Sequence, residues 1–305
     1  MSSTPPPGIT ADSAASLPQP ASGDAMTTRI QPILVPLDGS DLAERALPYA
    51  EALAGPDCQL ILLEVGQDED DFHLQDQHAD GCARLETVTG DPAQQILQVA
   101  TKLGVGLIVM TTHGRGALGR WAFGSVADTV SRTSPVPVMI IRPQEDSEPP
   151  EPVIRRIVAP LDGSSLAERA LPTAASLARQ LGIPVHLLTA TDLSHLLPVG
   201  LTPVAAFNAD VYEQTASQAQ HDAEEWLSQA ATQLQQSGIE VTQEVRVGAP
   251  FTAIEEIVEP GDVLVLVSRG RHGAARLVLG SLAEQLIRQG SAPVVLVPPG
   301  NQASE

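Results

Sequence analysis

The segment ILVPLDGSDLAERALPYAEALA at residues 33–54 returns as IVAPLDGSSLAERALPTAASLA at residues 157–178, with most positions identical. Each copy opens on a short apolar run, which is typical of a strand buried on both faces of a parallel sheet. An Asp-Gly-Ser turn and a segment with helical spacing follow. A match this dense does not arise from composition alone, so the chain is predicted to be a tandem duplication.

Later landmarks repeat in the same order. VTGDPAQQIL at residues 88–97 resembles VGAPFTAIEEIV at residues 247–258. Further apolar runs alternate with helical segments: QLILLEV, LIVMT and VPVMIIR in the first copy, and PVHLLTA, VLVLVS and APVVLVP in the second. Strands that alternate with helices predict right-handed crossovers. The expected fold is α/β, with one doubly wound parallel sheet in each copy.

The first helix of each copy carries a start signal and a proline. The start signal is a pair of residues with the three-residue spacing of a capping box. These pairs are Asp41 with Glu44 and Ser165 with Glu168. Pro48 and Pro172 fall inside the same helices and are expected to kink them, because proline lacks an N–H and clashes with the preceding turn.

The second copy contains an additional helical segment at residues 210–238. Its apolar residues recur at helical spacing, and they are Ala223, Leu227, Ala230, Ala231 and Leu234. At the same place the first copy has only the polar stretch GQDEDDFHLQDQHADGCA, residues 66–83. We therefore expect that the first copy is shortened and lacks one helix.

A glycine loop follows a strand in each copy and precedes a helix. Ligands of doubly wound sheets bind beyond the carboxyl ends of the strands, which is where these loops are expected. Glycines let backbone amides approach a phosphate, and a helix N-terminus adds free N–H groups. The candidate phosphate-binding residues are Gly114, Gly124 and Ser125 in the first copy and Gly270, Gly280 and Ser281 in the second. Alternatively, each glycine pair forms only a turn and a helix cap.

Charged residues stand beside these loops and after the first strands. Asp38 and Asp162 follow the first strand of each copy, where a carboxylate can bind a ribose hydroxyl or Mg²⁺, or can simply form a turn. His113 and Arg269 lie in the glycine loops and can pair with phosphate oxygens, or can remain solvated. No nucleophile and base form a convincing pair, so an enzyme is the less favoured class.

The composition excludes several kinds of partner. With 17 basic and 37 acidic side chains, the net charge of −20 opposes binding to nucleic acid. No apolar run approaches the roughly 18 residues that a membrane-spanning helix needs. Residues 1–29 lack the pattern of a secretory signal, and their Pro, Ser and Ala content predicts a disordered tail. A cytoplasmic protein is therefore expected.

Taken together, three landmarks resemble the universal stress protein family. They are PLDGS after the first strand, GDPAQQIL before the third helix, and HGRG followed by GSV and SPVPV near the end of the copy. The resemblance implies two domains, at residues 30–142 and 154–298, of the Rossmann-like, adenine nucleotide alpha-hydrolase-like fold. A linker at 143–153 joins them, and residues 299–305 form a short tail. Pairing of the last strands implies an intramolecular pseudo-dimer.

The resemblance also implies ATP or another adenine nucleotide as ligand, bound through the family pattern G-x2-G-x9-G-[ST]. Its last three elements match in both copies, but Thr111 and Val267 replace the first glycine. The added Cβ at these positions can keep the chain further from the ligand. By the same resemblance, Asp38 and Asp162 contact the nucleoside or a bound Mg²⁺. Val65 and Ala190 correspond to a small apolar residue near adenine.

Three functions remain open from the sequence. The favoured one is a stress-response protein that senses or stores ATP without efficient turnover. The first alternative is an interaction scaffold of the same family that does not bind nucleotide, which the replaced first glycines favour. The second is a slow ATPase. A homodimer of the tandem chain and an unidentified protein partner are the expected assemblies.

Overall fold

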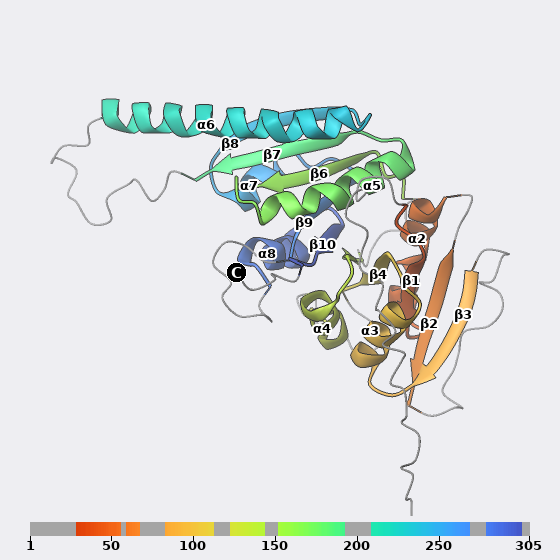
Figure 1. Ribbon diagram of the computed structural model, residues 1–305. Coiled ribbons are helices and arrows are strands. Elements are labelled where there is room, and N and C mark those ends of the chain that lie inside the picture. The colour runs from red at the N-terminus through yellow and green to blue at the C-terminus, as the bar shows by residue number, and fades with distance from the viewer. Residues whose placement is uncertain are drawn as a thin grey trace, which may run out of the picture.

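The computed structural model describes residues 29–55, 59–67, 83–112, 123–143, 152–192, 209–268 and 279–300, and within them the two copies share one sheet (Figure 1). Ten strands follow one another in the order β3-β2-β1-β4-β5-β10-β9-β6-β7-β8. The first copy supplies β1 (Ile33–Leu37), β2 (Leu60–Gly66), β3 (Ala83–Thr89), β4 (Leu107–Thr111) and β5 (Val138–Ile141). The second supplies β6 (Arg156–Leu161), β7 (Val185–Thr191), β8 (Val241–Val247), β9 (Asp262–Val267) and β10 (Val294–Val297).

Each half of the sheet is parallel and doubly wound. The order β3-β2-β1-β4-β5 in the first copy is repeated as β8-β7-β6-β9-β10 in the second. Parallel ladders join all neighbours within each half. The central strands are almost completely buried, as the unbroken apolar runs indicated. The predicted doubly wound α/β fold is confirmed, but the two copies contribute one parallel half each to a single sheet instead of forming two separate sheets.

The two halves meet through their last strands. β5 and β10 pair in antiparallel register, with Met139 opposite Val295 at the centre and Val138 opposite Leu296 on one side. Met139 and Val295 have no solvent exposure. The joint therefore lies inside a continuous core, and the expected pseudo-dimer is formed within one chain.

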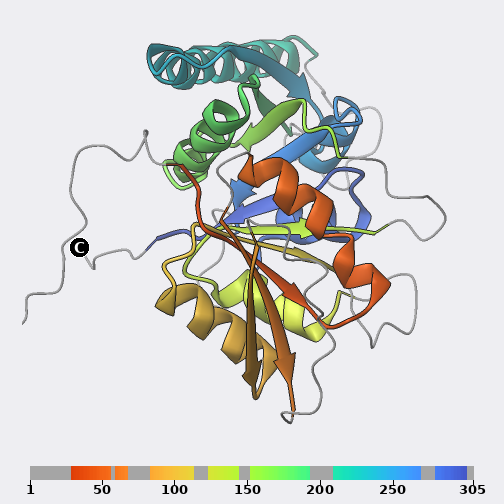
Figure 2. The same ribbon diagram turned by 90° about the vertical axis from the view of Figure 1, so that its right-hand side faces the viewer.

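Helices cover both faces of the sheet (Figure 2). On one face lie α1 (Asp41–Glu44), α2 (Leu47–Ala54), α5 (Leu171–Leu181) and the long α6 (Ala209–Gln236). The other face is covered by α3 (Pro92–Lys102), α4 (Ser125–Thr133), α7 (Pro250–Glu255) and α8 (Ser281–Gln289). Each face buries one hydrophobic cluster with residues from both copies, so the two copies are packed as well as hydrogen bonded.

The predicted helix start signals are not the caps. In the first copy the N-cap of α1 is Ser40, one residue before Asp41, and its side chain accepts the N–H of Ala43. In the second copy the Ser164 hydroxyl accepts the N–H of Ala167, but the N-cap of the 3-10 helix η2 (Ala167–Ala170) is Leu166. Asp41 and Ser165 follow these serines and are not the caps.

The prolines end one helix and start the next instead of kinking a single helix. Pro48 lies in the first turn of α2, and Pro172 lies in the first turn of α5. A proline is tolerated there because the N–H groups of a first turn have no partner within the helix. The prediction of one kinked helix in each copy was wrong.

The sequence analysis did not predict the strands β3 and β8, but it did predict the helix α6. β3 and β8 are the sheet edges, and their half-exposed residues do not form apolar runs. The helical segment of the second copy is confirmed as part of α6, where all five of its predicted core residues are buried. The prediction that the first copy lacks this helix depends on residues 68–82, which lie outside the described residues. So do nearly all of both predicted tails and most of the linker.

One side chain joins the copies near the start of the sheet. The side chain of Gln180 in α5 accepts the N–H of Ile30 at 3.0 Å and donates to the carbonyl of Leu53 at the end of α2, 2.6 Å away. Both contacts cross from the second copy to the first. The Gln180 amide thus fixes α5 against the amino end of the first copy.

Candidate functional site

The strand order reverses direction at one point in each copy, between β1 and β4 and between β6 and β9. The chain leaves β1 toward β2 on one side, whereas β4 leads to β5 on the other. Ligands of doubly wound sheets bind at such a switch point, beyond the carboxyl ends of the strands. Asp38 follows β1, and Thr111 ends β4. The structure therefore places both sequence-predicted residues at the switch point of the first copy.

The aspartates after the first strands fold back onto their own turn. Oδ1 of Asp38 accepts hydrogen bonds from the N–H and the hydroxyl of Ser40, at 3.1 and 2.6 Å. Asp162 and Ser164 repeat both contacts in the second copy. This geometry fits the turn-forming role that the sequence left open. It also orients each carboxylate at the sheet edge, where Asp162 is exposed and Asp38 is half-buried.

In each glycine loop, the residue at the end of the loop donates its N–H to the carbonyl of the residue at the start. In the first copy the N–H of Gly124 donates to the carbonyl of Thr112 at 2.9 Å, and the N–H of Thr112 donates to Ile141 of β5. In the second copy Gly280 donates to Ser268 at 2.9 Å. Each loop is thus closed at the carboxyl edge of the sheet. His113, Gly114, Arg269 and Gly270 lie within the loops and outside the described residues.

A helix N-terminus follows each loop directly. Gly124 and Gly280 are the N-caps of α4 and α8, and both adopt the same extended backbone conformation. Because both N-caps are glycines, neither helix has a side-chain cap among the described residues. Because the first N–H groups of a helix have no intrahelical partner, they are donors for an anion. Ser125 and Ser281 open these helices with exposed side chains.

The residues that replace the first family glycine are buried. Thr111 is 5% exposed and Val267 is 6% exposed. Val267 packs into the hydrophobic cluster beneath α5 and α6. The side chain of Val267 is therefore part of the core.

A buried carboxylate at the same edge was missed from the sequence. Glu64 in β2 is 2% exposed and lies opposite Leu37 of β1, immediately before the half-buried Val65. In the second copy Thr189 stands in the equivalent place and donates its hydroxyl to the carbonyl of Leu161 at 2.6 Å, one residue before the half-buried Ala190. The signal was the single charge inside the apolar run LILLEVG. The first copy thus carries an additional acidic group at its switch point.

No metal site emerges from the described ranges, which contain no group of three or more His, Cys, Asp or Glu side chains suited to a metal ion. The expected Mg²⁺ contacts of Asp38 and Asp162 therefore stay predictions.

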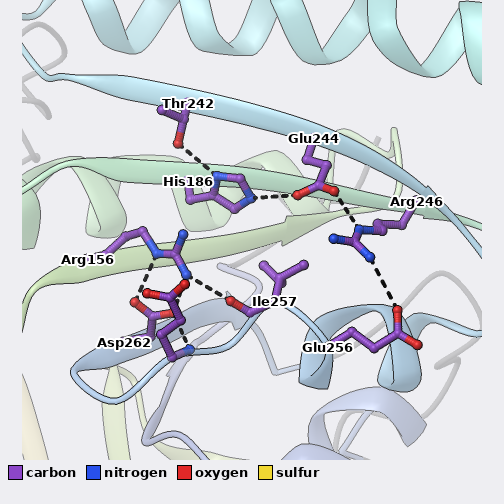
Figure 3. Close-up of polar contacts among 9 residues, drawn as sticks. Arg156, His186, Thr242, Glu244, Arg246, Glu256, Ile257 and Asp262 are labelled. Atoms are coloured by element: carbon purple, nitrogen blue, oxygen red, sulfur yellow. Dashed lines mark hydrogen bonds and ion pairs between the residues drawn. The ribbon is translucent and has the colours of Figure 1, made fainter.

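A second polar cluster lies on the second copy alone, at the amino ends of its strands (Figure 3). Arg156 of β6 donates through Nε and Nη2 to the carboxylate of Asp262 in β9, at 2.9 and 2.5 Å. Asp262 also accepts the N–H of Glu259 at 2.9 Å, and Arg156 donates to the carbonyl of Ile257. Because Asp262 is only 4% exposed, this pair fixes the connection from α7 to β9.

His186 of β7 lies in the same cluster. Its Nδ1 is 2.8 Å from the hydroxyl of Thr242, and its Nε2 is 3.8 Å from the carboxylate of Glu244 (Figure 3). Burial, with a smaller contribution from the Arg156 charge, lowers the pKa of His186. Nε2 has no hydrogen-bond partner among the described residues. The first copy has Ile61 at the equivalent place, so the cluster is not part of the repeated site.

The fold and the repeated loops define the class of protein: a tandem, doubly wound α/β chain with an uncapped helix N-terminus at each switch point. No helix in the described ranges is long and apolar enough to cross a membrane. The sequence model of the universal stress protein family matches residues 67–142 and 154–298. The chain therefore belongs to the universal stress protein family.

Individual relatives agree with this assignment. Universal stress protein Rv2005c of Mycobacterium tuberculosis is 25% identical over 216 residues, which cover 70% of this chain and 68% of the relative. Universal stress protein MJ0531 of Methanocaldococcus jannaschii is 27% identical over 149 residues, covering 48% of this chain and 84% of the relative. The crystal structure of PA1789, a functionally unknown protein from Pseudomonas aeruginosa PAO1, has a TM-score of 0.60 at 17% identity and covers 91% of this chain and 95% of that one. This likeness shows the fold.

Proposed function

We propose that this chain binds ATP or a related adenine nucleotide at the carboxyl edges of its two half-sheets, and that it senses or stores the nucleotide without efficient turnover. The observation that carries this proposal is the repeated loop closure at the switch point. In both copies a loop returns to the strand end and delivers an uncapped helix N-terminus there. Such a terminus binds phosphate through its N–H groups and its partial positive charge.

The residues take roles according to their places. Gly124 and Gly280 use their own N–H groups to close the loops and start the helices. The N–H groups of Ser125 and Val126 bind phosphate oxygens in the first copy, and those of Ser281 and Leu282 do so in the second. His113, Gly114, Arg269 and Gly270 complete the phosphate contacts from within the loops, with Thr111 and Val267 at the loop entrances. Asp38 and Asp162 bind the ribose or a Mg²⁺ ion, and Val65 and Ala190 contact the adenine.

Slow ATP hydrolysis is the less favoured function. A hydrolase needs a base or a water-positioning group near the transferred phosphoryl group. The carboxylates that follow the first strands, Asp38 and Asp162, already hold the turns that carry them. An interaction scaffold without nucleotide is the other candidate, and the bulkier residues at the first glycine position, Thr111 and Val267, favour it.

The organisation around the site is part of the proposal. Residues 30–142 and 154–298 act as two domains in a cytoplasmic protein, with the linker at 143–153. Nucleic acid is no partner, because the net charge of −20 opposes it. Further assembly is through a homodimer of the tandem chain or an unidentified protein partner.

The purified full chain tests the proposal. We expect denaturation to release an adenine nucleotide that mass spectrometry identifies, and calorimetry to show binding of ATP with Mg²⁺. Gly124→Asp and Gly280→Asp are each expected to weaken binding, because the carboxylate repels phosphate while still serving as a good N-cap. Gly238→Asp, in an open turn after α6, is the matched control. A wild-type chain that releases no nucleotide and gives no heat with ATP and Mg²⁺ excludes the proposal.

A further inference from the structure

Arg288 in α8 belongs to the second copy, but two residues of the first copy hold it. Its guanidinium carbon lies 5.9 Å from the centre of the Phe123 ring. Its backbone carbonyl accepts a hydrogen bond from Nη1 of Arg142, at 2.9 Å. Phe123 precedes α4, and Arg142 follows β5, so one residue of the second copy contacts both ends of the same first-copy unit.

The guanidinium is held in place from its own helix as well. Nε of Arg288 donates to Oε1 of Glu284, one turn earlier in α8, at 3.0 Å. A cation held within about 6 Å of an aromatic ring is attracted by the electrons of the ring face. Glu284 therefore holds the Arg288 guanidinium in place for a cation–π contact with the ring of Phe123.

Phe123 is placed where its position affects the proposed phosphate site. It directly precedes Gly124, which caps α4 and closes the glycine loop onto Thr112. The Phe123 side chain is half-buried against the hydrophobic cluster that α4 shares with the sheet. Fixing the ring thus fixes the backbone that presents the first N–H groups of α4.

The two first-copy residues that contact Arg288 have no chemical counterparts in the second copy. In the equivalent places the second copy has Leu279 instead of Phe123, and Pro298 instead of Arg142. Leucine offers no ring face to a cation, and proline has no side-chain donor. Arg132, the first-copy equivalent of Arg288, makes the same bond within its own helix, to Asp128 at 2.8 Å. The cross-copy contacts therefore support only the first-copy loop.

We infer that Arg288 of the second copy is a positioning residue for the nucleotide site of the first copy, and that this site binds adenine nucleotide more tightly because of it. The inference rests on the proposed function. If Arg288 acts in this way, the first-copy site is incomplete without the second copy, although both copies carry the same glycine-loop motif.

The test isolates the first-copy site in the full chain with the Gly280→Asp variant and measures ATP affinity with Mg²⁺ by calorimetry. In that background we expect Arg288→Met to weaken binding about two- to fivefold, the size of one cation–π contact. Arg84→Met, which removes an exposed arginine from the amino end of the edge strand β3, is the control and is expected to leave the affinity unchanged. Thermal unfolding, measured alongside, is expected to be similar for both variants.

A second variant separates positioning from a direct contact with the ligand. When Phe123→Leu is present, Arg288→Met is expected to have no further effect on affinity, because the ring through which it acts is gone. An undiminished Arg288→Met effect in that background, or equal effects of Arg288→Met and Arg84→Met, overturns the inference. Binding by wild type but not by Gly280→Asp also overturns it and leaves the proposed function standing. A wild-type chain that binds no nucleotide removes both.

Discussion

Gly163 lies against the indole of Trp226. A Cβ built on Gly163 would stand 3.2 Å from the indole Cε2 and 3.3 Å from Nε1, closer than ordinary van der Waals contact. The backbone φ of Gly163 is 73°, in the left-handed region. The Asp-Gly-Ser turn of the second copy therefore packs directly under α6, and glycine is required there for two reasons at once.

Gly163→Ala is expected to lower the free energy of unfolding by about 2 kcal/mol, from left-handed strain and displacement of the indole. Chemical unfolding followed by circular dichroism measures this. Gly182→Ala is the control, because Gly182 has φ of 66° and no atom near its added Cβ. It is expected to show only the backbone cost, of roughly 1 kcal/mol. Equal losses for both variants would contradict the contact with Trp226.

Acid is expected to destabilise the second copy through His186. Its pKa is lowered in the folded state, so the folded protein favours the neutral ring that lies among Arg156, Glu244, Arg246 and Asp262. The unfolded chain has the ordinary pKa near 6.5 and takes up the proton first as pH falls. The stabilisation is therefore complete above about pH 6.5 and is lost progressively below it, at no more than about 1.4 kcal/mol per pH unit.

The measurement is the free energy of unfolding at a series of pH values. His186→Gln is expected to reduce the slope of the unfolding free energy against pH below about pH 6.5, by an amount that corresponds to at most one proton. A His186→Gln curve that is parallel to wild type through this range would exclude His186 as the acid-sensitive group.

Removal of the Asp262 carboxylate is expected to cost about 3–5 kcal/mol of stability. Asp262→Ala leaves Arg156 without its bidentate partner and the N–H of Glu259 without its acceptor. The double variant Arg156→Met with Asp262→Ala is expected to be less unstable than Asp262→Ala alone, because no charge is then left unpaired. Glu256→Ala, which loses only the exposed pair with Arg246, should cost under about 1 kcal/mol. Thermal unfolding of the four proteins distinguishes these outcomes.

Ser131→Ala is expected to stabilise the protein by about 1 kcal/mol. Ser131 in α4 is 5% exposed, and its hydroxyl has no hydrogen-bond partner in the described part of the chain. Alanine removes the buried polar atom and favours the helix. Ser134→Ala is the opposite control, because the Ser134 hydroxyl donates to the carbonyl of Val136 at 2.7 Å and accepts its N–H. A loss of stability on Ser131→Ala would show that the hydroxyl has a partner.

The buried architecture could be predicted from the sequence because it depends on patterns that lie close together along the chain. Apolar runs such as Ile33–Leu37 occur only where both sheet faces are covered. The edge strands β3 and β8 were not predicted, because they lie at the borders of the sheet and their residues are partly exposed. They form neither an apolar run nor a clear alternation of apolar and polar residues. The cap of α1 was misplaced by one residue because Ser40 and Asp41 are both good caps, and only geometry selects between them.

Some residues of the two polar sites could be located from the sequence, and others could not. Asp38, Gly124 and their counterparts could be located because each follows a strand or precedes a helix within a repeated motif. Arg156, His186 and Asp262 could not, since strands far apart in the sequence bring them together. Arg288 could not be found either, because its contact with Phe123 depends on how the two copies are joined. The roles of the loop residues remain predictions.

The antiparallel joint between β5 and β10 has an evolutionary consequence. In a homodimer of single domains, every substitution appears on both sides of the two-fold axis, and neither subunit can specialise. Here the partner is covalently attached, so it stays bound at any dilution, since its effective concentration does not depend on that of the protein. Each half is then free to change alone, and the phenylalanine at residue 123 where the other half has Leu279 is one such divergence.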